Sequence, residues 1–283
     1  MTVTSATPAS SPQPDTARSA AKTTWPAFRA LLLRDLTVMR ASGKEVLVRT
    51  FMHPLLLVFV FTYVFPKIGQ TVEVDGGPAA FSTVLIAGVV ALAIVFQGMQ
   101  SVALPMVAEF GATNEIEDRV LAPIPIPMVA LEKMVAGALQ SLLAAVLVFP
   151  VAAIIPATPV HVRVDWPVLV TMLPLACIAS AALGLCFGTF FEPRSVPALL
   201  GIFLLPLIFL GAVYYPWAML TPIPWLKLTV LVNPLVYVSE GLRAALGAPV
   251  PHMPLVAVYG VLCLFTAVFT AVGIQRFKQR VLS

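Results

Sequence analysis

Long apolar stretches, each about as long as a bilayer is thick, follow one another through most of the chain. A helix needs about 20 apolar residues to cross the roughly 30 Å hydrocarbon layer. Five stretches reach this length: Val46–Phe65, Phe81–Leu104, Met134–Ile155, Val168–Phe191 and Leu255–Ile274. A sixth, Val196–Tyr215, is separated from its predecessor only by residues 192–195 (EPRS), which suit a tight hairpin at the membrane face. The pattern predicts an all-α membrane protein with six transmembrane helices.

The stretch 216–250 is also apolar, but four polar positions argue against a seventh span. It contains Lys227, Asn233 followed by Pro234, Glu240 and Arg243. Each charge at mid-bilayer costs about 2.5–3.5 kcal/mol, and non-helical backbone at membrane depth is tolerated only against protein or a water-filled cavity. We therefore expect two re-entrant half-helices between helices 5 and 6, joined near Asn233 and Pro234. Glu240 and Arg243 are expected to form an i,i+3 ion pair at the outer face.

Residues 26–42 predict an amphipathic helix ahead of the first span. Apolar residues recur there at helical spacing, and the basic residues point elsewhere. The apolar positions are Phe28, Leu31, Leu32, Leu36 and Met39, and the basic ones are Arg29, Arg34 and Arg40. Pro26 suits the first turn of a helix. Asp35 falls near the apolar face and is a charged exception to the amphipathic pattern. Such a helix lies along the membrane surface, either as an anchor or as an elbow that also contacts a cytoplasmic partner.

An acidic cluster lies between the second and third spans, in the predicted loop 105–133. Its charged residues are Glu109, Glu115, Glu117, Asp118, Arg119 and Glu132. A short helix from about Thr113 to Leu121 would have a capping residue and acid in its first turn. This segment is either a docking helix at the membrane face or an ordinary solvated loop.

A few side chains within the spans are candidates for a path or a gate. Gln97 and Gln100 share one helix face and either line a path or form interhelical hydrogen bonds. Phe203 and Leu207 in the fifth predicted span are further lining candidates. The pair Tyr214–Tyr215 is expected at the outer boundary, as a membrane anchor or as an outer gate. The motif at residues 184–188, GLCFG, permits close helix packing.

Composition supports a membrane protein and excludes several soluble classes. Hydrophobic residues make up 59% of the 283 residues and charged residues 11%, against roughly 45–50% and about 25% in globular domains. So few charges cannot cover a soluble globule. A soluble enzyme, a nucleic-acid binder and a disordered scaffold are therefore excluded. The three cysteines all fall in apolar runs, which supports neither a disulfide framework nor a thiolate metal site.

The distribution of basic residues predicts the orientation. With a cytoplasmic N-terminus and six spans, thirteen of the seventeen Lys and Arg residues fall in cytoplasmic segments, which agrees with the positive-inside rule. Both termini are then cytoplasmic. Residues 1–24 are rich in Ser, Thr, Pro and Ala and predict a disordered cytoplasmic tail rather than a cleaved signal peptide. Residues 25–283 are expected to form one transmembrane domain.

The sequence lacks the motifs of an enzyme or an energy-coupled carrier. It has no phosphate-binding loop, no H-E-x-x-H, no C-x-x-C and no serine elbow. Proton- or sodium-coupled carriers usually need charged residues at mid-span, and none is clearly placed there. We expect no catalytic, cofactor-binding or metal-binding residue in this chain. Any energy for uphill transport must come from another chain.

Two motifs resemble ABC-2-type permeases, the membrane subunits of bacterial ABC exporters for drugs, polyketides, lipids and polysaccharides. The first runs from Glu117 through residues 122–124 (API) to Lys133. The second is Asn233-Pro234-Leu235 with Tyr237, Glu240 and Arg243, after residues 215–217 (YPW) and 224–225 (PW). The resemblance covers about residues 25–280.

The resemblance implies roles and partners that the residues alone do not give. It implies a homodimer or heterodimer of such subunits in a bacterial cell membrane, each docked on a separate ATP-binding subunit that carries ATP and Mg. The implied ATPase-coupling helix contains Glu115, Glu117, Asp118 and Arg119. The implied interfacial helix contains Phe28, Arg29, Leu32, Arg34 and Arg40, and the half-helices at 216–246 would form the outer vestibule.

The function expected is export of an amphipathic or hydrophobic substrate, such as a drug, lipid or glycolipid, along a path formed by this subunit. A hydrophobic path with few charges favours that cargo over a charged polymer. The alternative is a non-transporting membrane scaffold or assembly factor. An intramembrane enzyme would need a paired nucleophile and base, and His53, His161 and His252 lie on different segments without an acidic partner nearby.

Overall fold

The computed structural model describes residues 16–41, 52, 56, 58–68, 77–111, 125–156, 163–248 and 250–282. These residues are mostly helical, and none of them lies in a β-strand. The long helices are α1 (Thr16–Ala41), α4 (Gly77–Gly111), α6 (Ile126–Ile154), α7 (Trp166–Phe190) and α11 (Leu255–Leu282). The shorter helices are η1 (Phe59–Val64), α3 (Phe65–Lys67), α8 (Val196–Phe209), η2 (Trp217–Leu220), α9 (Pro224–Thr229), η3 (Val230–Val232) and α10 (Pro234–Ala245).

Within the described part of the chain, four helices are long and apolar enough to cross a membrane. They are α4, α6, α7 and α11, and they coincide with the second, third, fourth and last predicted spans. The fifth predicted span is shorter than expected, since α8 has only 14 residues and ends at Phe209. Half of the first predicted span lies outside the described residues, and its described C-terminal part is helical. The protein is therefore a multi-pass membrane protein.

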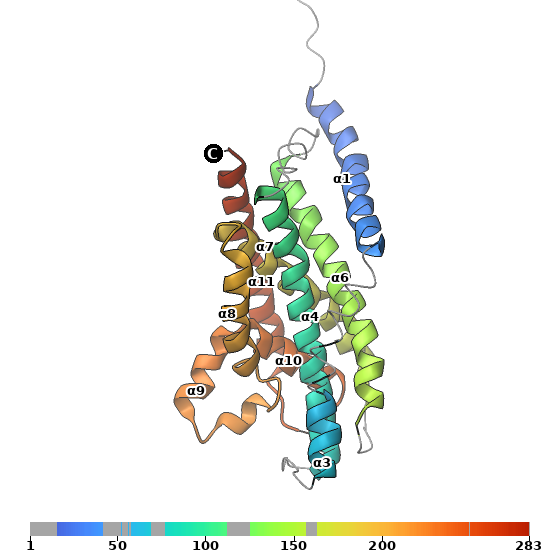
Figure 1. Ribbon diagram of the computed structural model, residues 1–283, viewed down its shortest axis with the longest axis vertical. Coiled ribbons are helices and arrows are strands. Elements are labelled where there is room, and N and C mark those ends of the chain that lie inside the picture. The colour runs from blue at the N-terminus through green and yellow to red at the C-terminus, as the bar shows by residue number, and fades with distance from the viewer. Residues whose placement is uncertain are drawn as a thin grey trace, which may run out of the picture.

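Helix α4 is the centre of the bundle. It packs against α6, α7 and α10, while α11 packs on the far side of α7 (Figure 1). In the most apolar part of α4, 94% of the residues are buried within the chain, against 11% in α11. A helix that is apolar on all sides can be surrounded by protein or by lipid. In this fold α4 is surrounded by protein, and α11 leaves most of its surface for other contacts.

Glycines allow α4 and α7 to approach closely. A Cβ atom at Gly184 would lie 2.5 Å from the backbone oxygen of Met99, and one at Gly188 would lie 3.1 Å from the Cα atom of Ala103. Gly98 on α4 likewise faces the side chain of Ser180. The close packing predicted from the G-x-x-x-G motif is confirmed.

Three element boundaries differ from the sequence predictions. Helix α4 continues through Pro105 to Gly111 and α6 begins at Ile126, so residues 105–111 and 126–133 are helical and do not belong to a loop. Helix α1 begins at Thr16, which makes residues 16–24 helical where a disordered tail was expected. Pro26 lies inside this helix, where it removes one backbone hydrogen bond.

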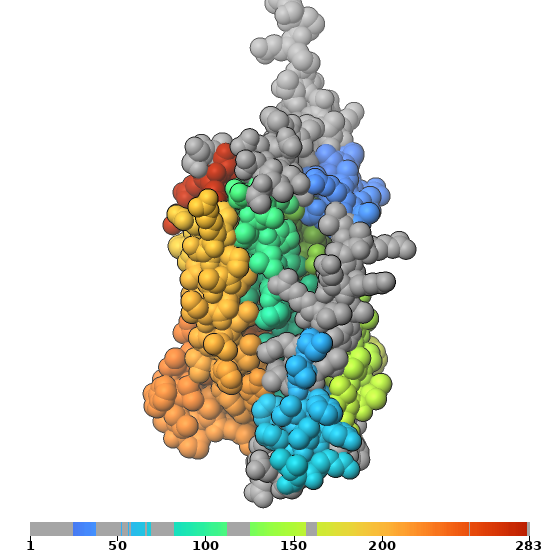
Figure 2. All heavy atoms as spheres, viewed as in Figure 1, coloured from blue at the N-terminus to red at the C-terminus, as the bar shows by residue number. Residues whose placement is uncertain are grey.

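The ends of the bundle are distinct. The C-terminal end of α11, the end of α4, the start of α6 and the turn between α7 and α8 lie at the upper end in Figure 1. Helices α3 and α9 lie at the lower end, and α1 runs beside the upper part of α6. Figure 2 shows one face of the molecule, with α8 along its left edge and α9 below α8.

Candidate functional site

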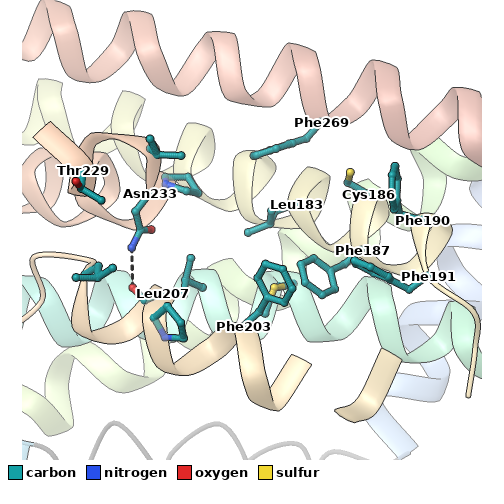
Figure 3. Close-up of a pocket in the computed structure, with 15 residues that line it drawn as sticks. Leu183, Cys186, Phe187, Phe190, Phe191, Phe203, Leu207, Thr229, Asn233 and Phe269 are labelled. Atoms are coloured by element: carbon teal, nitrogen blue, oxygen red, sulfur yellow. Dashed lines mark hydrogen bonds between the residues drawn. The ribbon is translucent and has the colours of Figure 1, made fainter. Parts of the chain in front are cut away.

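An apolar pocket of about 580 Å³ lies between α7, α8, α11 and the start of α10. We call it the phenylalanine pocket, because five Phe side chains line it. Figure 3 shows α11 and Phe269 on one side, α8 with Phe203 and Leu207 on the other, and α7 between them. Its lining residues are Met99, Leu183, Cys186, Phe187, Phe190, Phe191, Phe203, Pro206, Leu207, Leu210, Thr229, Val232, Asn233, Pro234 and Phe269.

The pocket offers a ligand almost no polar partner. Its Thr229 hydroxyl donates to the carbonyl oxygen of Trp225 at 2.8 Å. The Asn233 side-chain amide donates to the carbonyl oxygen of Leu207 at 2.8 Å and accepts from the backbone N–H of Leu235 at 2.9 Å. These groups are engaged within the chain, so the surface presented to a ligand is essentially hydrocarbon.

Aromatic rings concentrate at one end of the pocket. The Phe187 ring contacts Phe203 edge-on at 5.0 Å between centroids and lies 5.2 Å from Phe191. Phe190 lies 5.5 Å from Phe191, and its side chain is 53% exposed. The guanidinium of Arg276 lies over the Phe190 ring, 4.8 Å from its centroid. This end of the pocket therefore combines an exposed ring with a positive charge.

The four predicted path residues separate into two groups. Phe203 and Leu207 line the pocket. Gln97 and Gln100 are not among its lining residues and are buried inside the bundle. The Gln97 amide faces the Gln140 side chain on α6, at 3.5 Å between Nε2 and Oε1. For Gln97, the geometry agrees with the interhelical hydrogen-bond alternative.

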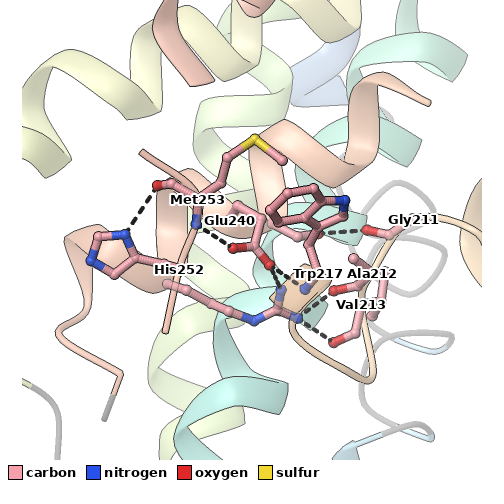
Figure 4. A network of polar contacts seen from close by, with 9 residues as sticks. Gly211, Ala212, Val213, Trp217, Glu240, His252 and Met253 are labelled. Carbon is pink, nitrogen blue, oxygen red and sulfur yellow. Dashed lines mark hydrogen bonds and ion pairs between the residues drawn. The ribbon is translucent and has the colours of Figure 1, made fainter. Parts of the chain in front are cut away.

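Glu240 and Arg243 form the centre of a fully buried polar network (Figure 4). The Arg243 Nη1 lies 2.7 Å from Glu240 Oε1, which confirms the predicted i,i+3 ion pair. That carboxylate also accepts from the backbone N–H groups of Trp217 and Met253, both at 2.9 Å. The pair has no exposed surface, because α10 packs against α4, α7 and α11 and is covered by the turns that it binds.

The network holds the turn that follows α8. Arg243 Nη2 donates to the carbonyl oxygens of Ala212 and Val213, and the Ser239 hydroxyl donates to that of Gly211 at 3.1 Å. Ala212 has φ 51°, in the left-handed region that residues other than glycine rarely occupy. The ion pair therefore stabilises a strained turn between α8 and η2.

Asn233, Pro234 and the two tyrosines near this network contact other parts of the chain. Asn233 precedes α10 as its N-cap, and Pro234 occupies the first turn. The Tyr215 hydroxyl donates to the carbonyl oxygen of Phe209 at 2.9 Å, and the Tyr214 ring packs 5.3 Å from Phe61. Both tyrosines therefore have partners within the chain.

A second buried cluster joins three helices at the other end of the bundle. Lys133 Nζ on α6 lies 2.6 Å from Glu109 Oε1 on α4 and 2.8 Å from Asp35 Oδ2 on α1. We call these three residues the Lys133 cluster. Lys133 is 4% exposed, and Glu132 beside it is fully buried. Glu109 and Glu132 therefore do not belong to a solvated acidic loop. They lie within helices and are buried, because the helices extend beyond the predicted boundaries.

The described part of α1 has the predicted amphipathic pattern. Phe28, Leu31, Leu32 and Leu36 are half-buried, whereas Arg29 and Arg34 are exposed. Asp35 lies on the half-buried face, because it bonds to Lys133. The side chain of Arg40 lies outside the described residues.

The residues of the expected coupling helix come between α4 and α6 in the sequence. Glu115, Glu117, Asp118 and Arg119 all lie outside the described residues. The helices on either side of them end at Gly111 and begin at Ile126. Among the described residues there is no group of three or more His, Cys, Asp or Glu side chains that could hold a metal ion.

Comparison with known proteins agrees with this architecture. Residues 26–247 match the family described as ABC-2 type transporter. The chain is 25% identical over 249 residues to the protein named inner membrane transport permease YadH from Escherichia coli K12, and the match covers 87% of this chain and 92% of that protein. The proteins of the same name from Escherichia coli O157:H7 and Shigella flexneri match over the same length with the same identity.

Proposed function

Because this chain belongs to the ABC-2 type transporter family, we propose that it is the transmembrane subunit of an ATP-driven exporter for an amphipathic or hydrophobic substrate. Family membership makes it a component of membrane transport that works in general with an ATP-binding subunit and in a dimeric arrangement. Its relatives carry the name of inner membrane transport permeases. The export direction, the cargo and the partners of this particular chain are our proposals.

The phenylalanine pocket is the observation that carries the choice of cargo. It has a volume of about 580 Å³, within the range of roughly 300–1,000 Å³ typical of small-molecule sites. Its walls supply aromatic and aliphatic surface, and its polar side chains are already hydrogen-bonded. A charged polymer would lose its hydration there without gaining a partner. A drug-like or lipid-like molecule gains from burial of its apolar surface.

The arrangement of the helix ends supports a six-span topology with both termini in the cytoplasm. The C-terminal end of α11, the α4–α6 junction and the α7–α8 turn share one end of the bundle (Figure 1). Lys133, Arg194, Arg276, Lys278 and Arg280 lie in or beside these segments. We therefore assign this end to the cytoplasm by the positive-inside rule. The short helices α9 and α10 would then be the two re-entrant half-helices on the outer side.

The coupling segment would lie at the same cytoplasmic end. The gap between Gly111 and Ile126 contains Glu115, Glu117, Asp118 and Arg119. A partner ATPase that grips this segment pulls on the ends of both α4 and α6. Because α4 is the buried centre of the bundle, movement of its end would reach α7 and α10, which border the phenylalanine pocket.

Reconstituted transport tests the proposal. The chain is purified as a complex with its ATP-binding partner subunit, and ATP-dependent movement of amphipathic fluorescent dyes into inside-out liposomes is measured. The double variant Glu117→Ala and Asp118→Ala is expected to reduce ATP-driven transport at least 10-fold, with the complex still able to form.

A matched control is available in the predicted outer loop. The double variant Glu73→Ala and Asp75→Ala removes the same number of carboxylates and should leave transport unchanged. Unaltered transport in the Glu117 and Asp118 variant would remove the coupling assignment. A complex that forms and hydrolyses ATP but moves no cargo would favour the scaffold alternative.

A further inference from the structure

Two residues of α11 that are seven positions apart face the same side of the phenylalanine pocket. Phe269 lines the pocket, and Arg276 lies over the ring of Phe190 at its end. Seven residues make about two helical turns, or about 10 Å along the axis. One face of α11 therefore carries the apolar side chain of Phe269 and, nearer the C-terminal end of the helix, the cation of Arg276.

The pocket is elongated along the bundle. On α7 its lining extends from Leu183 to Phe190, and on α8 from Phe203 to Leu210. Each of these segments also extends about 10 Å along its helix. One leaflet contributes roughly 15 Å to the hydrocarbon layer. The cavity therefore has the direction, and about two-thirds of the length, of an extended lipid chain in one leaflet.

The polarity of the interior selects a hydrocarbon occupant. The side chains of Thr229 and Asn233 form their hydrogen bonds with backbone groups of the chain. Water in a cavity needs two to four polar partners, and an apolar cavity does not provide them. Both Phe190 and Phe203 are about half exposed, at 53% and 49%. The pocket can therefore be entered from the side of the bundle.

The charge beside the pocket selects the headgroup. The described contacts of the Arg276 side chain are with neutral groups, namely the Phe190 ring and the Gln279 side-chain oxygen at 3.4 Å. Arg280, one turn further on, instead donates to the carbonyl oxygen of Phe191 at 2.8 Å and holds the end of α7. Arg276 is thus the cation that is placed to receive an anion from the membrane surface.

From these features we infer that the phenylalanine pocket holds one hydrocarbon chain of an anionic phospholipid, whose headgroup pairs with Arg276. The lipid occupies the leaflet at the C-terminal end of α11. It fills the space between α8 and α11. Without it these two helices are connected mainly by packing of α8 on α4, of α4 on α7 and of α7 on α11. The lipid occupies the pocket when no cargo is bound, and a cargo molecule that enters the same space must displace its hydrocarbon chain.

Lipid binding to the purified full-length chain tests this site directly. Native mass spectrometry measures the affinity for phosphatidylglycerol and for phosphatidylcholine with identical chains. We expect phosphatidylglycerol to bind about five-fold more tightly, the preference that one basic residue near an anionic headgroup supplies. Arg276→Gln should abolish this preference while phosphatidylcholine binding stays the same. Lys278→Gln, which removes a charge from another face of the same helix turn, should leave the preference intact.

The chain-binding half of the site has its own test. Leu207→Trp fills the cavity and should lower the affinity for both lipids at least five-fold. A phosphatidylglycerol with a photoreactive group in its tail should label Phe203, Leu207 or Phe269 in the wild-type chain, so the test does not depend on the folding of a variant. Equal affinity for both lipids, or labelling that avoids α8 and this face of α11, would overturn the inference. If labelling is lost in the dimer but not in the monomer, a second copy of the chain covers the pocket, and the inference is overturned as well.

Because the readout is binding by this chain alone, it is separate from the test of transport. A chain that transports but shows no lipid preference would contradict only the lipid site. A chain that binds phosphatidylglycerol at Arg276 without ATP-driven transport would contradict only the proposed function.

Discussion

The ammonium group of Lys133 on α6 lies 2.8 Å from the carboxylate of Asp35 on α1, although the two residues are 98 positions apart. The same ammonium lies 2.6 Å from Glu109 on α4. One side chain therefore links the N-terminal helix to the two helices that flank the proposed coupling segment. A displacement of that segment would be transmitted to α1 through this cluster.

Removal of the Lys133 charge should destabilise the protein strongly. In Lys133→Met, two mostly buried carboxylates lose their common cation, and breaking a buried pair in this way costs about 3–5 kcal/mol. Thermal unfolding followed by intrinsic fluorescence should show a clear fall in Tm, whereas Lys278→Met at an exposed position should have almost no effect. If both variants unfold at the wild-type temperature, the cluster does not stabilise the fold. Adding Asp35→Asn and Glu109→Gln to Lys133→Met should recover part of the loss.

The buried pair Glu240 and Arg243 should show strong coupling in a double-mutant cycle. Arg243→Met leaves the Glu240 carboxylate buried with only two backbone donors, and Glu240→Gln leaves the guanidinium without its counter-charge. Each single variant is expected to lose about 3–5 kcal/mol, and the double variant less than the sum of the two losses. Additive losses, measured by chemical denaturation in the same detergent, would mean that the pair contributes no interaction energy of its own.

Substitution of Ala212 by glycine should stabilise the turn after α8. Ala212 has φ 51°, and a left-handed residue other than glycine costs roughly 1–2 kcal/mol. Ala212→Gly is therefore expected to raise the free energy of unfolding by about 0.5–1 kcal/mol. Ala179→Gly, in the middle of α7, should lower it by about 0.5–1 kcal/mol. A fall in stability for Ala212→Gly similar to that of the control would contradict the assignment of strain to this turn.

Gly184 and Gly201 should respond oppositely to the same substitution. A Cβ atom at Gly184 would overlap the backbone of Met99, whereas nothing lies within 4 Å of one at Gly201. Gly184→Ala must separate α4 from α7 and is expected to cost about 1–3 kcal/mol. Gly201→Ala should be neutral or slightly stabilising, because alanine favours the helix. Equal stability of the two variants would show that the α4–α7 contact is looser than the structure has it.

Local features of the sequence predicted much of the helical structure correctly. The apolar runs located α4, α6, α7 and α11, because a helix in lipid must satisfy its own backbone hydrogen bonds within a continuous segment. Asn233 and Pro234 likewise marked the start of α10, since capping depends on neighbouring residues. The boundaries near Leu104 and Met134 were wrong, because the charges at Glu109 and Lys133 suggested the edge of the membrane.

The sequence alone predicted where α4, α6, α7 and α11 lie, the amphipathic face of α1 and the Glu240–Arg243 ion pair, because these features arise from residues within a few positions of one another. Of the six long spans expected from it, four are present among the described residues, and α8 is shorter. Which helix is central depends on how the whole chain packs. The apolar windows of α4 and α11 have similar mean hydropathy, 2.1 and 2.4, yet 94% of one is buried in protein and 11% of the other. Tertiary packing also explains Asp35, which interrupts the apolar arc of α1 and forms an ion pair with Lys133. The same packing brings Phe203 and Phe269 to one pocket. Such contacts depend on how the helices pack, and lipid and protein offer an apolar side chain nearly the same environment.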